Sequence, residues 1–160
     1  MADMLRLRDT INDDLVVFYQ QQLDPDASYM AAFTAKDPAD RVAFFAHWHK
    51  IMADETVKIQ TILFNGEIAG NVLSYEEEGR SEVSYWLGKE FWGKGIATQV
   101  LIIFLNQYNK IRPMYARVAK DNLASRRVLE KCGFVIIGES KGFANARGQE
   151  IDEFLLEYGE

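Results

Sequence analysis

The N-terminal part of the chain combines one alternating segment with a helical pattern. Residues 4–8 alternate apolar side chains with arginines, which is typical of a strand with one buried face. Asn12 or Asp13 can cap a helix that continues through about Gln22. The Asp24-Pro25 pair then indicates a turn that ends this helix. We therefore predict a first strand followed by a first helix.

A second helix follows, and then the period changes from helical to strand-like. Pro38 can occupy the first turn of this helix, where its missing N–H is tolerated. The periodic positions of the helix are Val42, Phe45, Trp48, His49 and Met52. Alternation then predicts strands at 56–64, 67–77 and 81–88. Asn65-Gly66 favours a type I′ hairpin turn, so we expect an antiparallel meander.

The pattern becomes helical again after Gly95. The positions that share one helical face are Ala97, Val100, Leu101, Phe104 and Tyr108. Arg112-Pro113 breaks this pattern, so the helix is expected to cover about residues 96–109. Residues 114–119 then predict a short strand. A helix that joins two strands in this way can act as a crossover connection.

The remaining residues predict one helix and two closing strands. The helix at 122–132 has Asn122 at its N-cap position and Gly133 at its C′ position. Segments 134–140 and 150–158 have the composition and spacing of strands. This order of elements indicates an α+β fold with a largely antiparallel sheet. No repeat or linker-like segment interrupts the sequence, so residues 1–160 are expected to form a single domain.

The composition of the chain indicates which binding partners and which cellular compartment to expect. The chain has 160 residues and a formal net charge of −6, which argues against a nucleic-acid partner. Cys132 is the single cysteine, so no internal disulfide can form, as is usual in a reducing cytoplasm. The sequence lacks an apolar run as long as a signal peptide or a membrane span. We therefore expect a cytoplasmic protein without a membrane partner.

Two glycines and a lysine precede the helix that begins near residue 96. Amides at the start of a helix lack intrahelical partners and carry partial positive charge. Glycines let the main chain approach an anion closely, while Lys94 adds charge and Thr98 a hydroxyl. Gly93-Lys94-Gly95 therefore indicates a phosphate or pyrophosphate site, although a tight strand-to-helix turn needs the same glycines. The P-loop pattern is absent, and Thr98 replaces a glycine that the dinucleotide fingerprint requires.

Two segments carry a family resemblance. The segment YWLGKEFWGKGIATQVL resembles motif A of the GNAT superfamily of acyl-CoA-dependent N-acetyltransferases, whose pattern Q/R-x-x-G-x-G/A falls on residues 92–97 with Trp92 in the first position. The segment DNLASRRVLEKCGF resembles a second block of the branch that contains the ribosomal-protein N-terminal (alanine/serine) acetyltransferases. The resemblance implies a GNAT-like, mixed but largely antiparallel sheet of seven strands flanked by about four helices. Strands 82–88 and 114–119 are expected to splay apart in its centre.

The resemblance also implies that acetyl-CoA binds between these splayed strands as a co-substrate, without a metal. The pantetheine arm is expected along the strand that ends at Gly88, and the pyrophosphate on the amides of residues 93–98. Asn122 is expected to hold a pantetheine amide, Ser125 to lie near the sulfur, and Arg126 or Lys131 to reach the ribose phosphate. The residues that the resemblance implies for cofactor binding are Trp86, Leu87, Gly88, Trp92, Gly93, Lys94, Gly95, Ile96, Ala97, Thr98, Asn122, Ser125 and Lys131.

Acetyl transfer to an amine requires a proton acceptor and a donor for the leaving sulfur. Glu82 is our candidate base, because alternation places it on the same strand face as Ser84 and Trp86 beside the proposed cleft. A solvated charge at the end of a strand is the alternative interpretation of Glu82. Leu129 occupies the position where many family members have a donor tyrosine, so we assign that role to Ser125. A serine that bonds the backbone in a first helical turn is the alternative there.

Other conspicuous residues are assigned structural roles. His47 and His49 are two positions apart and do not share a helix face, so they do not indicate a metal pair, and His49 is expected to be partly buried. Cys132 is expected to be a small core residue. Residues 76–78 are three glutamates, which we interpret as a solvated hairpin end or, alternatively, as part of an acceptor site for cationic amines.

We therefore expect an N-acetyltransferase that moves acetyl from acetyl-CoA directly to a primary amine of a protein N-terminus or a small molecule. A non-catalytic acyl-CoA-binding module and an unrelated phosphate binder remain as alternatives. The protein is expected to be a monomer or a homodimer.

Overall fold

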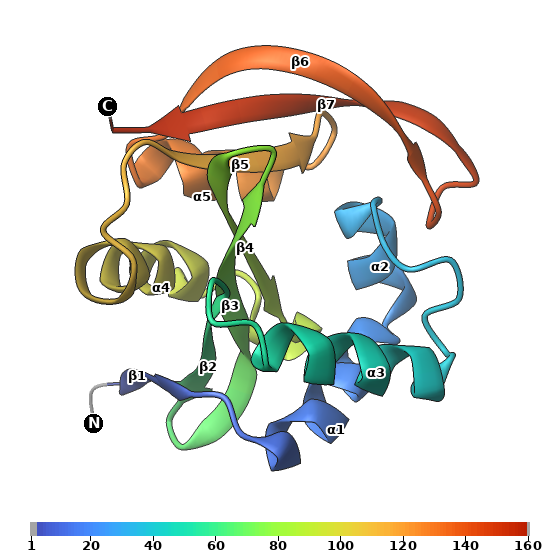
Figure 1. Ribbon diagram of the computed structural model, residues 1–160, viewed down its shortest axis with the longest axis vertical. Helices are drawn as coiled ribbons and strands as arrows, with labels where there is room; N and C mark the ends of the chain where they lie inside the picture. Colours follow the sequence, from blue (N-terminus) through green and yellow to red (C-terminus); the bar gives the residue numbers. More distant parts are fainter. Residues whose placement is uncertain (1–2, 160) are drawn as a thin grey trace.

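The computed structural model describes residues 3–159, in which one twisted sheet separates two groups of helices (Figure 1). Seven strands in these residues form the sheet, in the order β1-β2-β3-β4-β5-β7-β6. Each neighbouring pair is antiparallel except β4 and β5, which are parallel. The strands are β1 (Leu5–Asp9), β2 (Lys58–Phe64), β3 (Glu67–Glu77), β4 (Arg80–Leu87), β5 (Met114–Ala119), β6 (Val135–Ala144) and β7 (Gln149–Tyr158).

Five α-helices lie in residues 3–159 and cover both faces of the sheet (Figure 1). They are α1 (Leu15–Gln22), α2 (Pro25–Ala31), α3 (Arg41–Met52), α4 (Ile96–Ile103) and α5 (Leu123–Lys131). α4 and α5 pack on one face, where Val100 and Leu129 belong to the main apolar core. α1 and α3 pack on the other face, where Leu15, Phe18 and Trp48 form a second apolar cluster against β2 and β3.

The predicted α+β class and most of the predicted elements are confirmed. Segments 67–77 and 114–119 form β3 and β5 with the expected bounds. Asn65 and Gly66 have φ values of 52° and 83°, the left-handed backbone that both central residues of a type I′ turn require. The caps of α5 are also confirmed: Asn122 accepts a 3.2 Å hydrogen bond from the Ser125 amide, and Gly133 has a φ of 103°.

The first helices confirm one prediction and contradict another. α1 ends at Gln22, before Asp24-Pro25, as expected, but α2, which was not predicted, begins there with Pro25 in its first turn. The Asp24 carboxylate accepts hydrogen bonds from the next two free amides, those of Asp26 and Ala27, at 2.8 and 3.1 Å. Pro38 does not lie inside the following helix, since α3 begins only after Asp40, which caps it. The described residues therefore contain five α-helices where about four were expected.

The predicted helix after Gly95 changes character before it ends. α4 is regular to Ile103, and residues Phe104–Tyr108 form a π-helical turn. The chain then reaches β5 through the Arg112-Pro113 turn. This connection carries it across the sheet face, so that β4 and β5 become parallel neighbours as the crossover prediction required.

Candidate active site

The two central strands separate where the resemblance implied a splayed pair. β4 and β5 are paired only at Ser81–Met114 and Glu82–Tyr115. β4 continues to Leu87 and β5 to Ala119 without further pairing between the described residues of these strands. The free edges of β4 and β5 therefore face each other across an opening that widens beyond Glu82.

Only some main-chain groups on β4 face this opening. The Gly88 amide donates a 2.8 Å hydrogen bond to the Ala69 carbonyl of β3, and the Trp86 carbonyl lies against Gly70 of the same strand. Polar groups of successive residues point to opposite edges of a strand, so those of Leu87 face away from β3. The Leu87 carbonyl accepts a 3.1 Å hydrogen bond from the Trp92 indole, which ties the following loop to the end of β4. Of the expected pantetheine-binding residues on this strand, Leu87 is thus the one whose backbone points into the opening.

The glycine turn presents free amides at the start of α4. Gly93 and Gly95 have φ values of 74° and 73°, a backbone conformation that side chains rarely adopt. A Cβ placed on either glycine would have no heavy atom within 4 Å. Within the described part of the chain, the amides of residues 93–95 donate no recorded hydrogen bond, and Ile96, Ala97 and Thr98 follow in the first helical turn. Free main-chain amides at such a turn can bind an anion, and the exposed Lys94 lies between the two glycines.

The start of α5 contacts β4 beyond the last residue pair of β4 and β5. The Tyr85 hydroxyl of β4 lies 2.9 Å from the Ser125 hydroxyl. The Asn122 amide group donates a 3.1 Å hydrogen bond to the Met30 carbonyl at the end of α2, in addition to capping α5. The alternative interpretation of Ser125 as a residue that bonds the helix backbone is wrong, because its recorded side-chain partner is Tyr85.

The other candidate phosphate contacts lie near the ends of α5. The Cys132 sulfur lies 3.6 Å from the Thr98 carbonyl, which brings the C-terminal end of α5 to the first turn of α4. Lys131, the last residue of α5, is exposed. Arg126 forms a 3.0 Å ion pair with Glu130 and lies over the Phe154 ring. Burial raises the pKa of the Cys132 thiol, in agreement with a core role.

Glu82 is buried at the point where the opening begins. Its side chain is 2% exposed, and one carboxylate oxygen lies 3.1 Å from the Arg117 guanidinium of β5. The second oxygen accepts no hydrogen bond from any described residue. Burial raises the pKa of Glu82, against the opposing effect of Arg117. The alternative interpretation of Glu82 as a solvated strand-end charge is therefore wrong.

Two more ionisable groups share this sheet face with Glu82. Glu153 of β7 lies 3.2 Å from Arg117, so one guanidinium bridges two carboxylates. Tyr75 of β3 stands opposite Glu82 in the strand register. Burial and the negative charges of Glu82 and Glu77 raise the pKa of Tyr75 to about 12. The face of the sheet beside Glu82 therefore carries excess negative charge.

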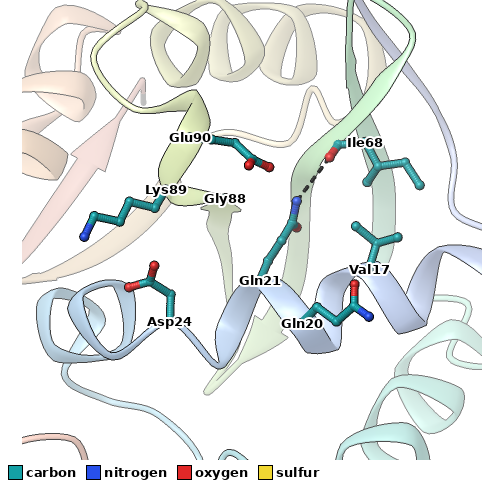
Figure 2. Close-up of a pocket in the computed structure, with 8 residues that line it drawn as sticks. All are labelled: Val17, Gln20, Gln21, Asp24, Ile68, Gly88, Lys89 and Glu90. Carbon is teal, nitrogen blue, oxygen red and sulfur yellow. Dashed lines mark hydrogen bonds between the residues drawn. The ribbon is translucent and has the colours of Figure 1, made fainter.

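A cavity of about 270 Å³ lies between α1 and the end of β4 (Figure 2). Its lining residues are Val17, Gln20, Gln21, Asp24, Ile68, Gly88, Lys89 and Glu90. Gln21 crosses it to donate a 3.1 Å hydrogen bond to the Ile68 carbonyl, while its side-chain oxygen is buried without a partner in residues 3–159. The cavity touches Gly88, so α1 forms a wall beside the end of the strand that borders the opening.

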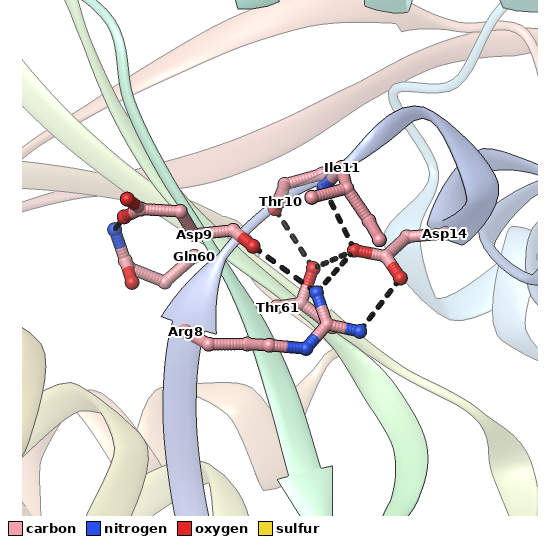
Figure 3. Close-up of polar contacts among 7 residues, drawn as sticks. All are labelled: Arg8, Asp9, Thr10, Ile11, Asp14, Gln60 and Thr61. Atoms are coloured by element: carbon pink, nitrogen blue, oxygen red, sulfur yellow. Dashed lines mark hydrogen bonds and ion pairs between the residues drawn. The ribbon is translucent and has the colours of Figure 1, made fainter.

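A second polar cluster, centred on Asp14 and Arg8, connects β1 to β2 and has a structural role (Figure 3). Both terminal guanidinium nitrogens of Arg8 donate hydrogen bonds to the Asp14 carboxylate, at 2.7 and 2.8 Å. Asp14 also accepts hydrogen bonds from the Ile11 amide and the Thr61 hydroxyl. Burial alone raises the pKa of Asp14, but these hydrogen bonds hold it below its usual value. The cluster fastens β1 and the turn before α1 to β2.

Several other sequence predictions concern residues outside the opening. Leu129, at the position of the family's donor tyrosine, is 3% exposed in the main core. His49 is exposed and lies 2.7 Å from the Asn12 side chain, whereas we expected it to be partly buried. Residues 76–78 are exposed at the β3–β4 hairpin. Within residues 3–159, no cluster of three or more His, Cys, Asp or Glu side chains could hold a metal. None of the helices in these residues combines the length and apolar character needed to cross a membrane.

Comparison with known proteins gives one family match over most of the chain. A family profile described as an acetyltransferase (GNAT) domain matches residues 4–135. The uncharacterized N-acetyltransferase p20 of Bacillus licheniformis is 31% identical over 84 residues, which cover 51% of this chain and 47% of that protein. This chain therefore aligns with about half the length of p20.

Two other similar proteins are covered over more of their length. The candidate ribosomal N-acetyltransferase YdaF of Bacillus subtilis (strain 168) is 26% identical over 130 residues, 75% of this chain and 71% of that protein. The structure of spermidine N-acetyltransferase from Vibrio cholerae, solved with CoA and spermine, has a TM-score of 0.77 at 20% identity, with 96% of this chain and 95% of that chain covered. This structural likeness supports the fold.

Proposed function

The chain belongs to the GNAT acetyltransferase family, and we propose that it transfers acetyl from acetyl-CoA directly to a primary amine. The observation that carries this proposal is the opening between β4 and β5, which has free amides at one end and the buried Glu82 at its apex. The free amides can donate hydrogen bonds to the diphosphate of acetyl-CoA, and the opening can take its extended pantetheine arm. A carboxylate without a second partner suits the removal of a proton from the acceptor.

The residues of the glycine turn fit the phosphates of acetyl-CoA. Left-handed glycines at 93 and 95 leave the main chain uncovered, and the helix dipole adds partial positive charge. Lys94 lies within the turn, and Lys94 and Lys131 are both exposed, so they are our candidate side chains for pairing with phosphate oxygens. Asn122 can offer its amide to the pantetheine arm if it exchanges the Met30 carbonyl for the ligand.

Glu82 is our candidate for the group that removes the acceptor proton. Acetyl-CoA supplies an activated acetyl group as a thioester, and the acceptor amine must be neutral to attack it. A primary amine is mostly protonated at neutral pH. Burial raises the pKa of Glu82 towards the range in which a carboxylate is an effective base. Its free oxygen can take the proton directly or through one water molecule.

The acceptor is a primary amine of either a protein N-terminus or a small molecule. YdaF supports the first class and the spermidine acetyltransferase supports the second. Excess negative charge around Glu82, Glu153 and the cavity residues Asp24 and Glu90 attracts a cationic amine of either class. The first helices, which line the cavity beside Gly88, are the expected acceptor wall.

An acceptor screen followed by thiol release from acetyl-CoA tests this proposal. The panel should contain peptides with free N-termini, their N-acetylated counterparts, polyamines and amino acids. We expect release of CoA with at least one free amine, and no release with a blocked peptide. Tight binding of acetyl-CoA without release for any amine would instead support an acyl-CoA-binding module. Equal stabilisation by ATP and acetyl-CoA in a thermal-shift assay would support an unrelated phosphate binder.

A further inference from the structure

The Tyr85 hydroxyl is a partly buried polar group to which we assigned no role from the sequence. Tyr85 lies on β4, three residues beyond the last pair that joins this strand to β5. Its ring packs partly buried against the main core, and its hydroxyl reaches across to Ser125 in the first turn of α5. The hydroxyl pair therefore joins β4 to α5 beyond the point where β4 and β5 stop pairing.

The two hydroxyls leave one donor unused. In residues 3–159, the recorded side-chain hydrogen bonds of Tyr85 and Ser125 are limited to the one between them. A phenol is more acidic than an aliphatic alcohol, so Tyr85 is the better donor of the pair. When Tyr85 donates to the Ser125 oxygen, the Ser125 proton has no acceptor in the described chain. Burial raises the pKa of Tyr85, which keeps the phenol protonated at neutral pH.

The pair and Glu82 lie on opposite sides of the opening. Side chains three positions apart on a strand point to opposite faces, so Tyr85 faces α5 while Glu82 faces Arg117 and Glu153. A thioester between the strands would therefore have a carboxylate on the side of the attacking amine. The family resemblance places Ser125 near the sulfur, so the free hydroxyl proton on the other face would be available to the departing sulfur.

We propose that Tyr85 is a positioning residue, which orients the Ser125 hydroxyl so that it donates to the departing sulfur of CoA. This inference rests on the proposed acetyl transfer and adds Tyr85 to its machinery. The amine nitrogen forms a bond to the acetyl carbon, and the C–S bond breaks with its electron pair on sulfur. The proton lost by the amine balances the proton gained by the thiol. Ser125 stabilises the negative sulfur until that proton arrives, and Tyr85 fixes the direction of the Ser125 O–H bond.

The direct test is the ionisation of CoA bound to the enzyme, measured by thiolate absorbance in the ultraviolet across a pH titration. We expect the bound thiol to have a lower pKa than free CoA. Ser125→Ala should raise the pKa of the bound thiol by about one unit, since a hydrogen bond to a charged group is lost. Tyr85→Phe should raise this pKa by at least about half of the Ser125→Ala shift, whereas Tyr108→Phe should leave it unchanged. Tyr108 is a suitable control because its hydroxyl bonds the Leu7 carbonyl on the same side of the sheet.

Steady-state kinetics supply a second readout. Tyr85→Phe should lower kcat about tenfold and change the KM for acetyl-CoA less than about twofold. Adding Tyr85→Phe to Ser125→Ala should cause little further loss, because Tyr85 acts through Ser125. The inference would be overturned if either single variant left the pKa of the bound thiol unchanged. It would also be overturned if the losses of kcat were additive in the double variant.

The titration also separates this inference from the proposed function, since it needs no acceptor. If the pKa of the bound thiol is lowered but the enzyme acetylates no amine, the proposed transfer reaction is wrong and the placement of the hydroxyl pair still holds. If the enzyme transfers acetyl normally but Tyr85→Phe leaves the pKa of the bound thiol unchanged, only the role of Tyr85 is overturned.

Discussion

Glu82 forms an ion pair with Arg117 of β5, and Glu82 is also the last residue of β4 that pairs with β5 in the sheet. The guanidinium nitrogen lies 3.1 Å from one carboxylate oxygen, and the Glu82 side chain is 2% exposed. The pair places a charged group with a free oxygen at the apex of the opening between the strands. Arg117 also contacts Glu153, so the ionisation of Glu82 depends on charges contributed by two neighbouring strands.

Glu82→Gln should lower turnover much more than affinity for acetyl-CoA. The amide keeps the shape of the side chain but cannot accept a proton, so we expect kcat to fall roughly 100-fold. The KM for acetyl-CoA should change less than about twofold. Steady-state kinetics with the best acceptor of the screen measure both parameters. Equal losses in both, or no loss in either, would remove Glu82 as the base.

The pH dependence of the wild-type enzyme should report the raised pKa of Glu82. A base must be deprotonated, so activity should fall as the pH drops through a pKa above the ordinary glutamate value of about 4.3. Glu153→Gln removes a negative charge that raises this pKa. Its acid limb should therefore shift to lower pH, with kcat at the plateau retained. A shift to higher pH, or none, would contradict the proposed coupling.

Gly95→Ala should weaken acetyl-CoA binding while the protein stays folded. The methyl group would project where no heavy atom lies within 4 Å, into the surface that we assign to phosphate. We expect affinity to fall at least about tenfold, and stability to fall by about 1 kcal/mol because of the positive φ. Isothermal titration calorimetry and urea unfolding measure these changes.

Gly66→Ala is the matched control for this variant. Gly66 also has a positive φ and open space around it, but it lies in the β2–β3 hairpin. It should lose similar stability and keep its affinity for acetyl-CoA. If both variants lost affinity alike, backbone strain rather than phosphate contact would explain the effect.

Asp14→Asn should destabilise the fold at neutral pH by roughly 3 kcal/mol, since it leaves Arg8 without its partner inside the structure. The folded-state pKa of Asp14 is depressed, so its stabilisation is present above the unfolded pKa, about 3.9, and is lost as pH falls through the folded value. Urea unfolding at pH 7 and pH 3 should show a penalty that shrinks on acidification. The exposed Asp13→Asn should have little effect at either pH. A penalty that is independent of pH would contradict a role for the Asp14 charge.

The strands were predictable because their signals are local. Alternation marks β3 and β5, and Asn65-Gly66 specifies the hairpin through its own backbone preferences. α2 was missed because its seven residues are too few for a clear apolar period, and Pro25 was interpreted only as a terminator. The cap that Asp24 supplies was the available signal.

The candidate site was predictable only where residues adjacent in sequence form it. The glycine turn is local, so its free amides followed from Gly93 and Gly95. The separation of β4 from β5 depends on pairing between distant segments and came from the family resemblance. Tyr85 was missed because its partner Ser125 is forty positions away, and no spacing rule connects a strand residue to that helix.

A crystal structure of the protein with CoA would test directly where the cofactor binds. We expect the diphosphate within hydrogen-bonding distance of main-chain amides between Gly93 and Thr98. We also expect the pantetheine arm between β4 and β5 and the sulfur beside Ser125. CoA bound elsewhere, with these amides turned away from it, would show that the proposed site is wrong.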